Sequence, residues 1–459
     1  MDCLSATSMV DMLYRGDISA RELAQEALDK AERLEPTLNA FVHLDADAAL
    51  ASAAATDNTR AMGQAVGKLA GVPTSVKDLI DVRGMVTTFG SRSMEDNMRG
   101  QDAPSVARLR AEGSTILGKT TTTEFGCKAG GGDSPLTGVT RNAWDSSRTP
   151  GGSSAGAATS VAAGVTPYAI GTDGGGSVRI PASLCGVFGI KAQFGRVPIY
   201  PVSATPTLGH VGVLSRSVAD AALALEVMSG FEPSDPFAVA ANVPNWSSAC
   251  TGNIKGMRII WSPTLGYARP TAEVLRVTEL TVQALEGLGA QIEQREHIMH
   301  DPIELWMSEF YAGVGTKLGG ILKSSPHLLD PAVADVLSKA IGTQTLEEYY
   351  RQVFQRFDLR EEVKKLFEEC DLLVTPTLPV TAFEAGRNVP PGYEDRNMVS
   401  WVYYTYPFNL TGNPAASIPC GSDDGGMPVG LQAVAATHRE DNLFRIASAV
   451  ELERPWSYK

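Results

Sequence analysis

Short apolar runs alternate with helical stretches in the first half of the chain, and this rhythm limits the folds that the chain can adopt. Three runs have the length and composition of buried strands: Pro73–Val76, Thr115–Leu117 and Tyr168–Gly171. Helical stretches are expected at Asp102–Glu112 and Ser153–Ala163. Strands that alternate with helices favour a sheet whose two faces are both covered. We therefore expect an α/β fold: a large mixed, mostly buried β-sheet with helices on both faces.

The chain is long enough for one large core. It has 459 residues, 43% of them hydrophobic, and its 45 glycines and 27 prolines suit a loop-rich enzyme. Further helices are expected at Ala272–Leu288, Pro302–Leu322 and Leu346–Glu369. We expect a single domain over residues 1–459, with residues 200–345 as a candidate variable region for substrate specificity.

The net charge and the cysteines restrict the partners, metal sites and cellular compartment that are expected. A formal net charge of −13 disfavours binding to nucleic acid and to anionic membranes. The six cysteines stand singly, with neither a CxxC pair nor zinc spacing. No apolar run reaches the length of a membrane span, and Met1–Ser5 lacks the basic start of a signal peptide. We expect a cytoplasmic monomer or homodimer that needs no metal or cofactor.

Two glycine-rich segments carry serines 24 positions apart, Ser153 and Ser177. Ser177 follows three glycines directly after an expected strand, so the amides of Gly174, Gly175, Gly176 and Ser177 are candidate donors to an oxyanion. The alternatives are a phosphate-binding turn, which the absence of a GxxxxGK[ST] pattern weakens, or a simple tight turn.

Ser153 and Lys77 complete a possible proton path. A serine at the start of a helix is often only an N-cap, but a hydroxyl can also accept one proton while donating another. Lys77 ends the apolar run Val72–Val76 and could extend to solvent, pair with Asp78, or act as a base. As a base it must be neutral, so its pKa must fall from about 10.4 to about 7–8. None of the six histidines has the context of a serine triad.

At these residues the chain resembles the amidase signature family of Ser-Ser-Lys hydrolases. The resemblance rests on Gly151–Ser154 and Thr172–Ala182, with Lys77 upstream and Pro407–Gly412 near the end. It implies that Ser177 is the nucleophile, Ser153 the bridging serine and Lys77 the base, with a cis Gly152–Ser153 peptide.

The resemblance also suggests residues around the substrate. It places Cys127 in a loop that lines the acyl pocket, next to Gly130 and Gly131, and gives Thr172 a hydrogen bond within the site. Trp306, Phe310 and Tyr311 lie within about one helical turn of each other. Such clusters are more often core than pocket, but in the site they would favour an aromatic or apolar substrate.

The expected function is hydrolysis of a small-molecule amide through a Ser177 acyl-enzyme. Aryl or alkyl amides fit best, with carbamate (urethane) or ester cleavage open to the same route. One alternative is the glutamine-hydrolysing component of an aminoacyl-tRNA amidotransferase, its A subunit, which shares the signature and needs partner subunits. An alternative of another class is a non-catalytic binding protein on this scaffold.

Overall fold

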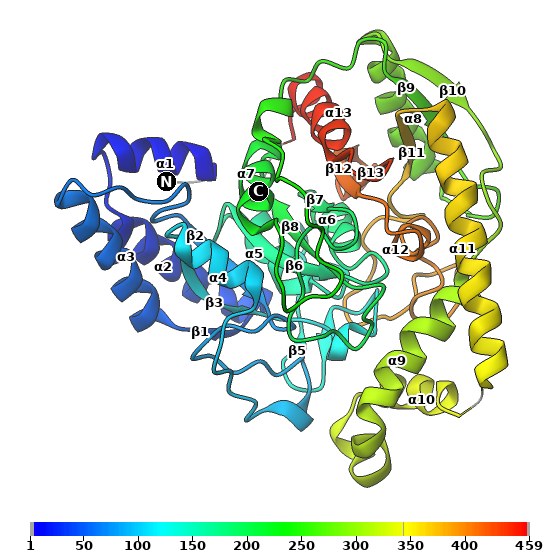
Figure 1. Cartoon of the computed structure of the whole chain (residues 1–459), viewed down its shortest axis with the longest axis horizontal. Coiled ribbons are helices and arrows are strands. Elements are labelled where there is room, and N and C mark those ends of the chain that lie inside the picture. Colours follow the sequence, from blue (N-terminus) through cyan, green and yellow to red (C-terminus); the bar gives the residue numbers. More distant parts are fainter. Residues whose placement is uncertain (1–3, 343, 457–459) are drawn as a thin grey trace.

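A computed structural model describes residues 4–342 and 344–456 (Figure 1). Eleven strands in this part of the chain form one sheet, in the order β1-β3-β2-β6-β8-β7-β12-β13-β11-β9-β10. Their bounds are β1 Phe41–Leu44, β2 Pro73–Lys77, β3 Thr115–Thr120, β6 Tyr168–Asp173, β7 Phe188–Lys191, β8 His210–Ser215, β9 Arg258–Trp261, β10 Gln291–Gln294, β11 Leu372–Pro376, β12 Ala415–Ser422 and β13 Pro428–Ala435. A separate small ribbon pairs β4 (Asp133–Ser134) with β5 (Gly138–Val139).

The sheet is mixed, as expected. β2 runs parallel to both β3 and β6, and β9 runs parallel to β10 and β11, whereas the central strands from β6 to β13 pair antiparallel. Parallel neighbours place their carboxyl ends at the same edge of a sheet. The ends of β2 and β6 therefore bring Lys77 close to Thr172.

Helices cover both faces of the sheet. They are α1 Ala6–Arg15, α2 Ala20–Leu38, α3 Ala46–Ala61, α4 Pro104–Ala111, α5 Ala155–Ala162, α6 Arg179–Cys185, α7 Val218–Met228, α8 Ala272–Gly287, α9 Ile303–Ser324, α10 Pro331–Ala340, α11 Leu346–Glu369, α12 Pro407–Leu410 and α13 Glu440–Glu453. In β6, Tyr168 and Ile170 join a core cluster with α7 and α13, whereas Ala169 between them packs in the cluster of α5 and α6. This alternation confirms the α/β fold with a sheet buried on both sides.

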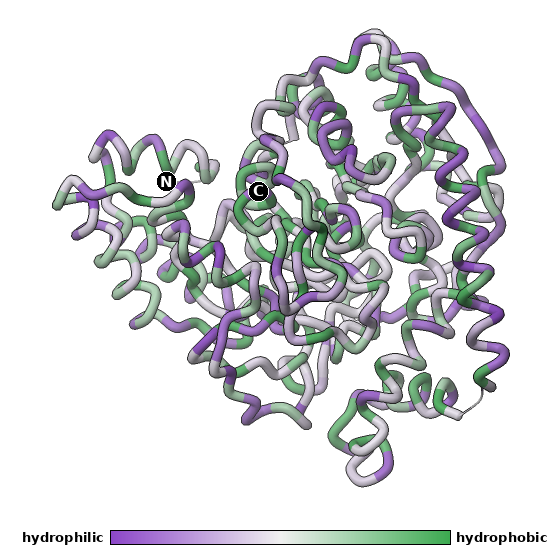
Figure 2. The backbone as a smooth tube through the Cα atoms, viewed as in Figure 1, coloured by the Kyte–Doolittle hydropathy of each residue, from purple (hydrophilic) through white to green (hydrophobic). Residues whose placement is uncertain are grey.

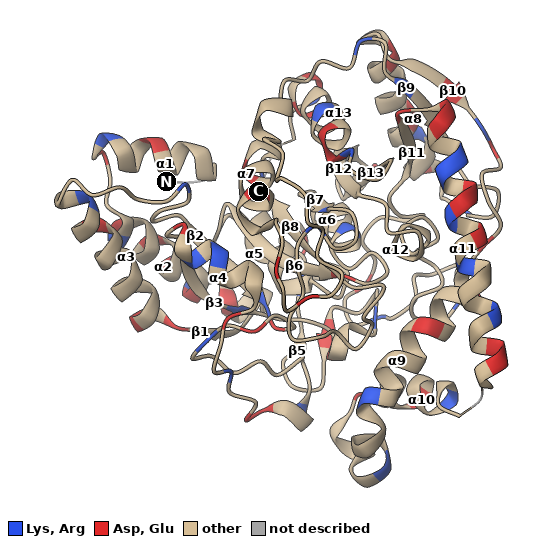
Figure 3. Ribbon diagram, in the orientation of Figure 1, with Lys and Arg blue, Asp and Glu red and all other residues tan. Residues whose placement is uncertain are grey.

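Helices form the two ends of the molecule and carry many of its charged residues. α1–α3 lie at one end of the molecule, and α9–α11 form the opposite side, with α11 along the outer edge (Figure 1). Hydrophilic residues follow much of α11 in Figure 2, and Figure 3 shows that many of the charged residues lie on such outer helices. In the described chain, none of the helices combines the length and apolar character that crossing a bilayer requires.

The end of α2 differs from the sequence-based expectation. The sequence Ser19–Glu22 has the pattern of a helix start, and the sequence predicts that Pro36 stops this helix, but α2 continues to Leu38 and ends where Asn39 adopts φ 49°. A proline in a last turn removes one intrahelical hydrogen bond, and here the Asn39 cap completes the helix end.

The region 200–345 contributes to the common sheet. Its strands β8, β9 and β10 join the sheet, whereas α9 and α10 lie outside it. That this region determines substrate specificity stays a prediction.

Candidate active site

Lys77 lies at the carboxyl end of β2, fully buried, and contacts two hydroxyl groups. Its Nζ is 2.7 Å from Ser153 Oγ and 2.9 Å from Thr172 Oγ1. Asp78 does not pair with it, because the Asp78 carboxylate accepts from Lys119, 3.0 Å away, and from Thr88. Of the alternatives open at Lys77, an extended solvent-facing lysine and an Asp78 ion pair are therefore both excluded.

Burial governs the charge of Lys77. Removal from water lowers the pKa of Lys77 well below the ordinary value for lysine, and the negative charge of Asp173 opposes this only in part. A lysine with a depressed pKa is neutral over more of the pH range and can accept a proton. The environment is thus the one that a lysine base needs.

Ser153 stands where the chain enters α5. The Gly152–Ser153 peptide is cis, as the family resemblance implies, and the Ser153 side chain is buried. Small residues let α5 start close to another strand of backbone: a side chain at Gly156 would come within 2.6 Å of the Thr121 amide nitrogen. The Ser154 amide donates to the Ser177 carbonyl at 3.2 Å, which places the two serine segments side by side.

The amides of the glycine segment divide into two groups. Gly176 N–H donates to Asp173 Oδ1 at 2.8 Å, so it is not available to an oxyanion, contrary to the expectation for this residue. For Gly174, Gly175 and Ser177, the described chain offers the amide no hydrogen-bond acceptor. Gly175 and Ser177 also line a pocket, which makes their two amides the best-placed donors.

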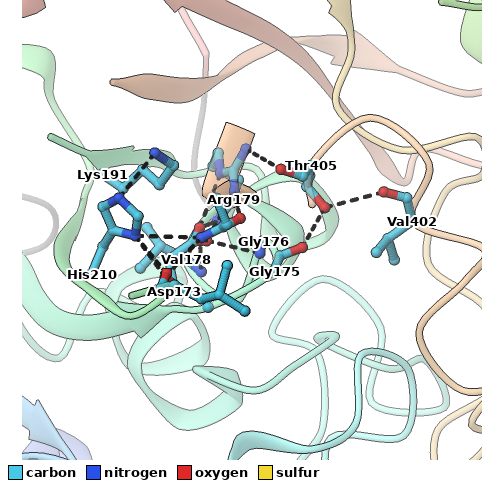
Figure 4. A network of polar contacts seen from close by, with 12 residues as sticks. Asp173, Gly175, Gly176, Val178, Arg179, Lys191, His210, Val402 and Thr405 are labelled. Atoms are coloured by element: carbon cyan, nitrogen blue, oxygen red, sulfur yellow. Dashed lines mark hydrogen bonds and ion pairs between the residues drawn. The ribbon is translucent and has the colours of Figure 1, made fainter. Parts of the chain in front are cut away.

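A buried ion pair between Asp173 and Arg179 lies next to the glycine segment (Figure 4). Asp173 and Arg179 are fully buried, and Arg179 Nη2 lies 2.9 Å from Asp173 Oδ1. Burial alone would raise the pKa of Asp173, but Arg179, Lys191 and a hydrogen bond from Asn409 hold it well below the usual range. Nearby His210 stays neutral, because burial and Lys191 lower its pKa, and its Nδ1 donates to the Leu208 carbonyl at 2.8 Å.

Replacing Arg179 with methionine is expected to destabilise the fold strongly. The Asp173 carboxylate would stay buried without its main counter-charge, which costs about 3–5 kcal/mol of unfolding free energy. Urea denaturation measures this loss. Arg276→Met, which breaks an exposed ion pair with Asp424, serves as the control and should cost less than about 1 kcal/mol. Equal losses for the two variants would contradict this account.

The pocket that opens beside Ser177 is mainly apolar. Its lining consists of Gly126, Lys128, Ala129, Gly175, Ser177, Ile180, Trp306, Phe310, Val399, Val402 and Tyr406. The sequence favours a core position for Trp306 and Phe310, and both are indeed buried in a hydrophobic core cluster. They also line this pocket, with their rings stacked and the ring centroids 4.5 Å apart. Their spacing of one helical turn along α9 was the signal in the sequence. Tyr311 instead packs behind them and donates to the Cys127 carbonyl.

The four predicted substrate-binding residues are not part of the pocket lining. Cys127 is fully buried in the core, and burial raises the pKa of its thiol well above the ordinary value. A side chain at Gly130 would collide with the Asn388 backbone, and one at Gly131 with the Asp133 side chain of the same loop, so neither glycine has open space beside it. Cys127, Gly130 and Gly131 are absent from the pocket lining, in which Gly126, Lys128 and Ala129 represent this loop. Thr172 makes the hydrogen bond within the site that the resemblance implies, since its hydroxyl accepts from Lys77, but it does not line the pocket.

Lys128 is a charged residue in the pocket lining, but two acidic side chains already neutralise its charge. Its Nζ lies 2.7 Å from Asp133 Oδ2 and 2.8 Å from Asp330 Oδ2. The adjacent Glu124 carboxylate accepts from the Asp330 amide, and burial raises the pKa of Glu124 to about 7. Residues 4–342 and 344–456 contain no group of three or more His, Cys, Asp or Glu side chains arranged to hold a metal ion.

Comparisons with known proteins agree with this geometry. The family model described as Amidase matches residues 22–444. An acylamidase of Rhodococcus erythropolis is 35% identical, covering 99% of this chain and 96% of that protein. The A subunit of a glutamyl-tRNA(Gln) amidotransferase from Cyanothece sp. is 34% identical, covering 98% of each.

Solved structures give the same result. A bacterial aryl acylamidase described as belonging to the amidase signature enzymes superposes with a TM-score of 0.92 at 28% identity, over 99% of this chain and 97% of that one. A 6-aminohexanoate cyclic dimer hydrolase superposes with a TM-score of 0.90 at 27% identity, covering 99% and 97%. This chain belongs to the amidase signature family and is a hydrolase that acts on amide C–N bonds.

Proposed function

We propose that this hydrolase cleaves aryl or alkyl amides through an acyl-enzyme on Ser177. Neutral Lys77 draws a proton from Ser153, which in turn takes the proton of Ser177 as that oxygen attacks the carbonyl carbon. The amides of Gly175 and Ser177 stabilise the oxyanion. The relay returns the proton to the leaving nitrogen, the amine departs, and water then cleaves the ester by the same path.

The observation that carries this proposal is the contact of buried Lys77 with Ser153, next to a pocket that contains Ser177. Burial of a lysine costs free energy and is not by itself a sign of catalysis, since Lys191 is also fully buried. At Lys77 the buried amine contacts a serine hydroxyl beside a pocket that contains a second serine, which is the arrangement that a proton relay uses. The geometry therefore favours catalysis over the binding-protein alternative.

The pocket supports an apolar substrate. Ile180, Trp306, Phe310, Val399 and Val402 supply most of its wall. Aromatic and aliphatic walls favour aryl or alkyl groups. Carbamates and esters carry the same kind of carbonyl and are further candidate substrates of this route.

Glutamine hydrolysis within an amidotransferase is the second candidate. Relatives named as the glutamyl-tRNA(Gln) amidotransferase component match at similar identity and coverage, which favours it. The pocket argues against it, since a glutamine substrate carries a carboxylate and an ammonium group that need charged partners. Among the lining residues described, Lys128 carries a charge, and Asp133 and Asp330 already neutralise it.

A substrate panel on one enzyme sample tests the choice. We expect the chain alone to hydrolyse a chromogenic anilide with a kcat/KM at least about 100-fold above that for glutamine, because an apolar pocket leaves the charges of glutamine unpaired. Primary amides and carbamates complete the panel. Glutamine as the fastest substrate, or activity that depends on added partner subunits, would favour the amidotransferase function instead.

A further inference from the structure

The glycine segment beside Ser177 lacks side chains of its own to fix its backbone. Glycine adopts many backbone conformations, so three successive glycines form a flexible stretch unless other groups hold them. Oxyanion donors are effective because they are aimed before the reaction begins. The position of the Gly175 amide must therefore depend on contacts from elsewhere in the chain.

Trp306 of α9 holds the peptide on one side of Gly175. Its indole N–H donates to the Gly174 carbonyl at 2.8 Å, although the two residues are 132 positions apart. In a planar trans peptide, the carbonyl and the following N–H point in opposite directions. The hydrogen bond from Trp306 to the Gly174 carbonyl therefore makes Gly175 N–H point in the opposite direction, away from the indole nitrogen.

Thr405 holds the peptide on the other side of Gly175 (Figure 4). Its hydroxyl donates to the Gly175 carbonyl at 2.7 Å, and the same oxygen lies 3.1 Å from the Val402 carbonyl. A hydroxyl has a single proton, which the shorter contact takes. At the opposite end of this peptide, Gly176 N–H donates to Asp173, so both ends are fixed.

Close packing completes the arrangement. A side chain at Gly175 would come within 2.5 Å of the Trp306 ring, and one at Gly176 would collide with Thr405. Glycines at both positions allow Trp306 and Thr405 to approach the backbone closely enough for their hydrogen bonds.

We propose that Trp306, through its indole N–H, and Thr405, through its hydroxyl, are positioning residues that fix the two peptide planes around Gly175 and hold its amide as an oxyanion donor. This inference rests on the proposed acyl transfer by Ser177. It assigns to two residues from the second half of the chain a role in transition-state stabilisation that is separate from substrate binding.

Thr405 offers a matched pair of variants. Thr405→Val removes the hydroxyl at nearly constant volume, and Thr405→Ser keeps it. An interaction made only in the transition state lowers kcat and kcat/KM equally. For a chromogenic anilide we expect Thr405→Val to lower kcat about 10- to 100-fold with KM within about twofold, and Thr405→Ser to stay within about threefold of the parent kcat.

Trp306→Phe supplies an independent test, because it keeps a ring over Phe310 but loses the N–H. We expect a loss in kcat of the same order, about 10- to 100-fold. Trp401→Phe is the control: Trp401 is a fully buried tryptophan whose N–H donates to the Asn388 carbonyl, outside the pocket. Its kcat should remain within about twofold of the parent value.

Titration with a fluorophosphonate that labels the active serine normalises each kcat to the amount of correctly folded site. A parent-like kcat in both Thr405→Val and Trp306→Phe would overturn the inference, as would a Thr405→Ser variant as slow as Thr405→Val. Failure of the underlying function is distinguishable, because it would appear as anilide turnover retained in Ser177→Ala, whatever the Thr405 and Trp306 variants do.

Discussion

Replacement of Ser177 by alanine is expected to reduce anilide hydrolysis by at least about 10⁴-fold. The variant retains the pocket and the Gly175 amide but has no oxygen to form the acyl-enzyme. Ser177 lines the pocket, and its carbonyl accepts from the Ser154 amide, so the backbone contact survives the substitution. Steady-state turnover, with mass spectrometry of the fluorophosphonate-treated protein, measures the loss of both activity and labelling.

Ser160→Ala is the matched control for that substitution. Ser160 is a buried serine of α5 whose hydroxyl donates to the Ala157 carbonyl, away from the pocket. Its activity should stay within about threefold of the parent enzyme, since a distant site contributes independently. Turnover of Ser177→Ala at a rate comparable to that of Ser160→Ala would exclude Ser177 as the nucleophile.

Substitution of Lys77 is expected to have the second largest effect. Lys77→Met nearly preserves the volume of the buried side chain but has no lone pair to take a proton, so kcat should fall at least about 10³-fold. Lys77→Arg should be equally inactive, because arginine stays protonated at every accessible pH. Single-turnover acylation by an anilide measures the affected step.

The Lys77→Arg variant separates two roles. If Lys77 served only as a positive charge, arginine would restore much of the rate. Activity of Lys77→Arg near that of the parent enzyme would therefore contradict the role of Lys77 as a base and leave it an electrostatic one.

The sheet was predictable where strands are short apolar runs next to turns. The local composition predicts strands β2, β3 and β6. Because β2 and β6 pair in parallel, their carboxyl ends lie at the same edge of the sheet. β7 and β8 were not anticipated, since each is defined by antiparallel pairing with strands far away in the sequence, β8 with β6 and β7 with β12. The end of α2 could not be predicted from Pro36 alone. The proline predicts an end at residue 36, whereas the helix continues for two more residues to Leu38, where the Asn39 cap ends it.

The candidate catalytic residues were predictable in identity, whereas the residues that surround them were not. Ser153 lies in a glycine-rich motif, and the family resemblance implies Lys77 as the base far upstream of it. The structure brings the two side chains into contact although they are 76 positions apart. The partners of the glycine segment, Trp306 and Thr405, are 132 and 230 positions away from the carbonyls they hold, so their role depends on tertiary packing. The same holds for Cys127, because its burial depends on packing contributed by distant segments.

The most direct test of the central claim is the pH dependence of Ser177 acylation in single turnover, for the parent enzyme and for Lys77→Met. Because the base must be unprotonated, the rate should fall as pH decreases through the pKa of Lys77. Burial sets that pKa well below the ordinary value for lysine, so the loss of rate at low pH should occur well below that value. The residual rate of Lys77→Met should show no such loss of rate. If both proteins lost acylation rate over the same pH range, another group would be the base.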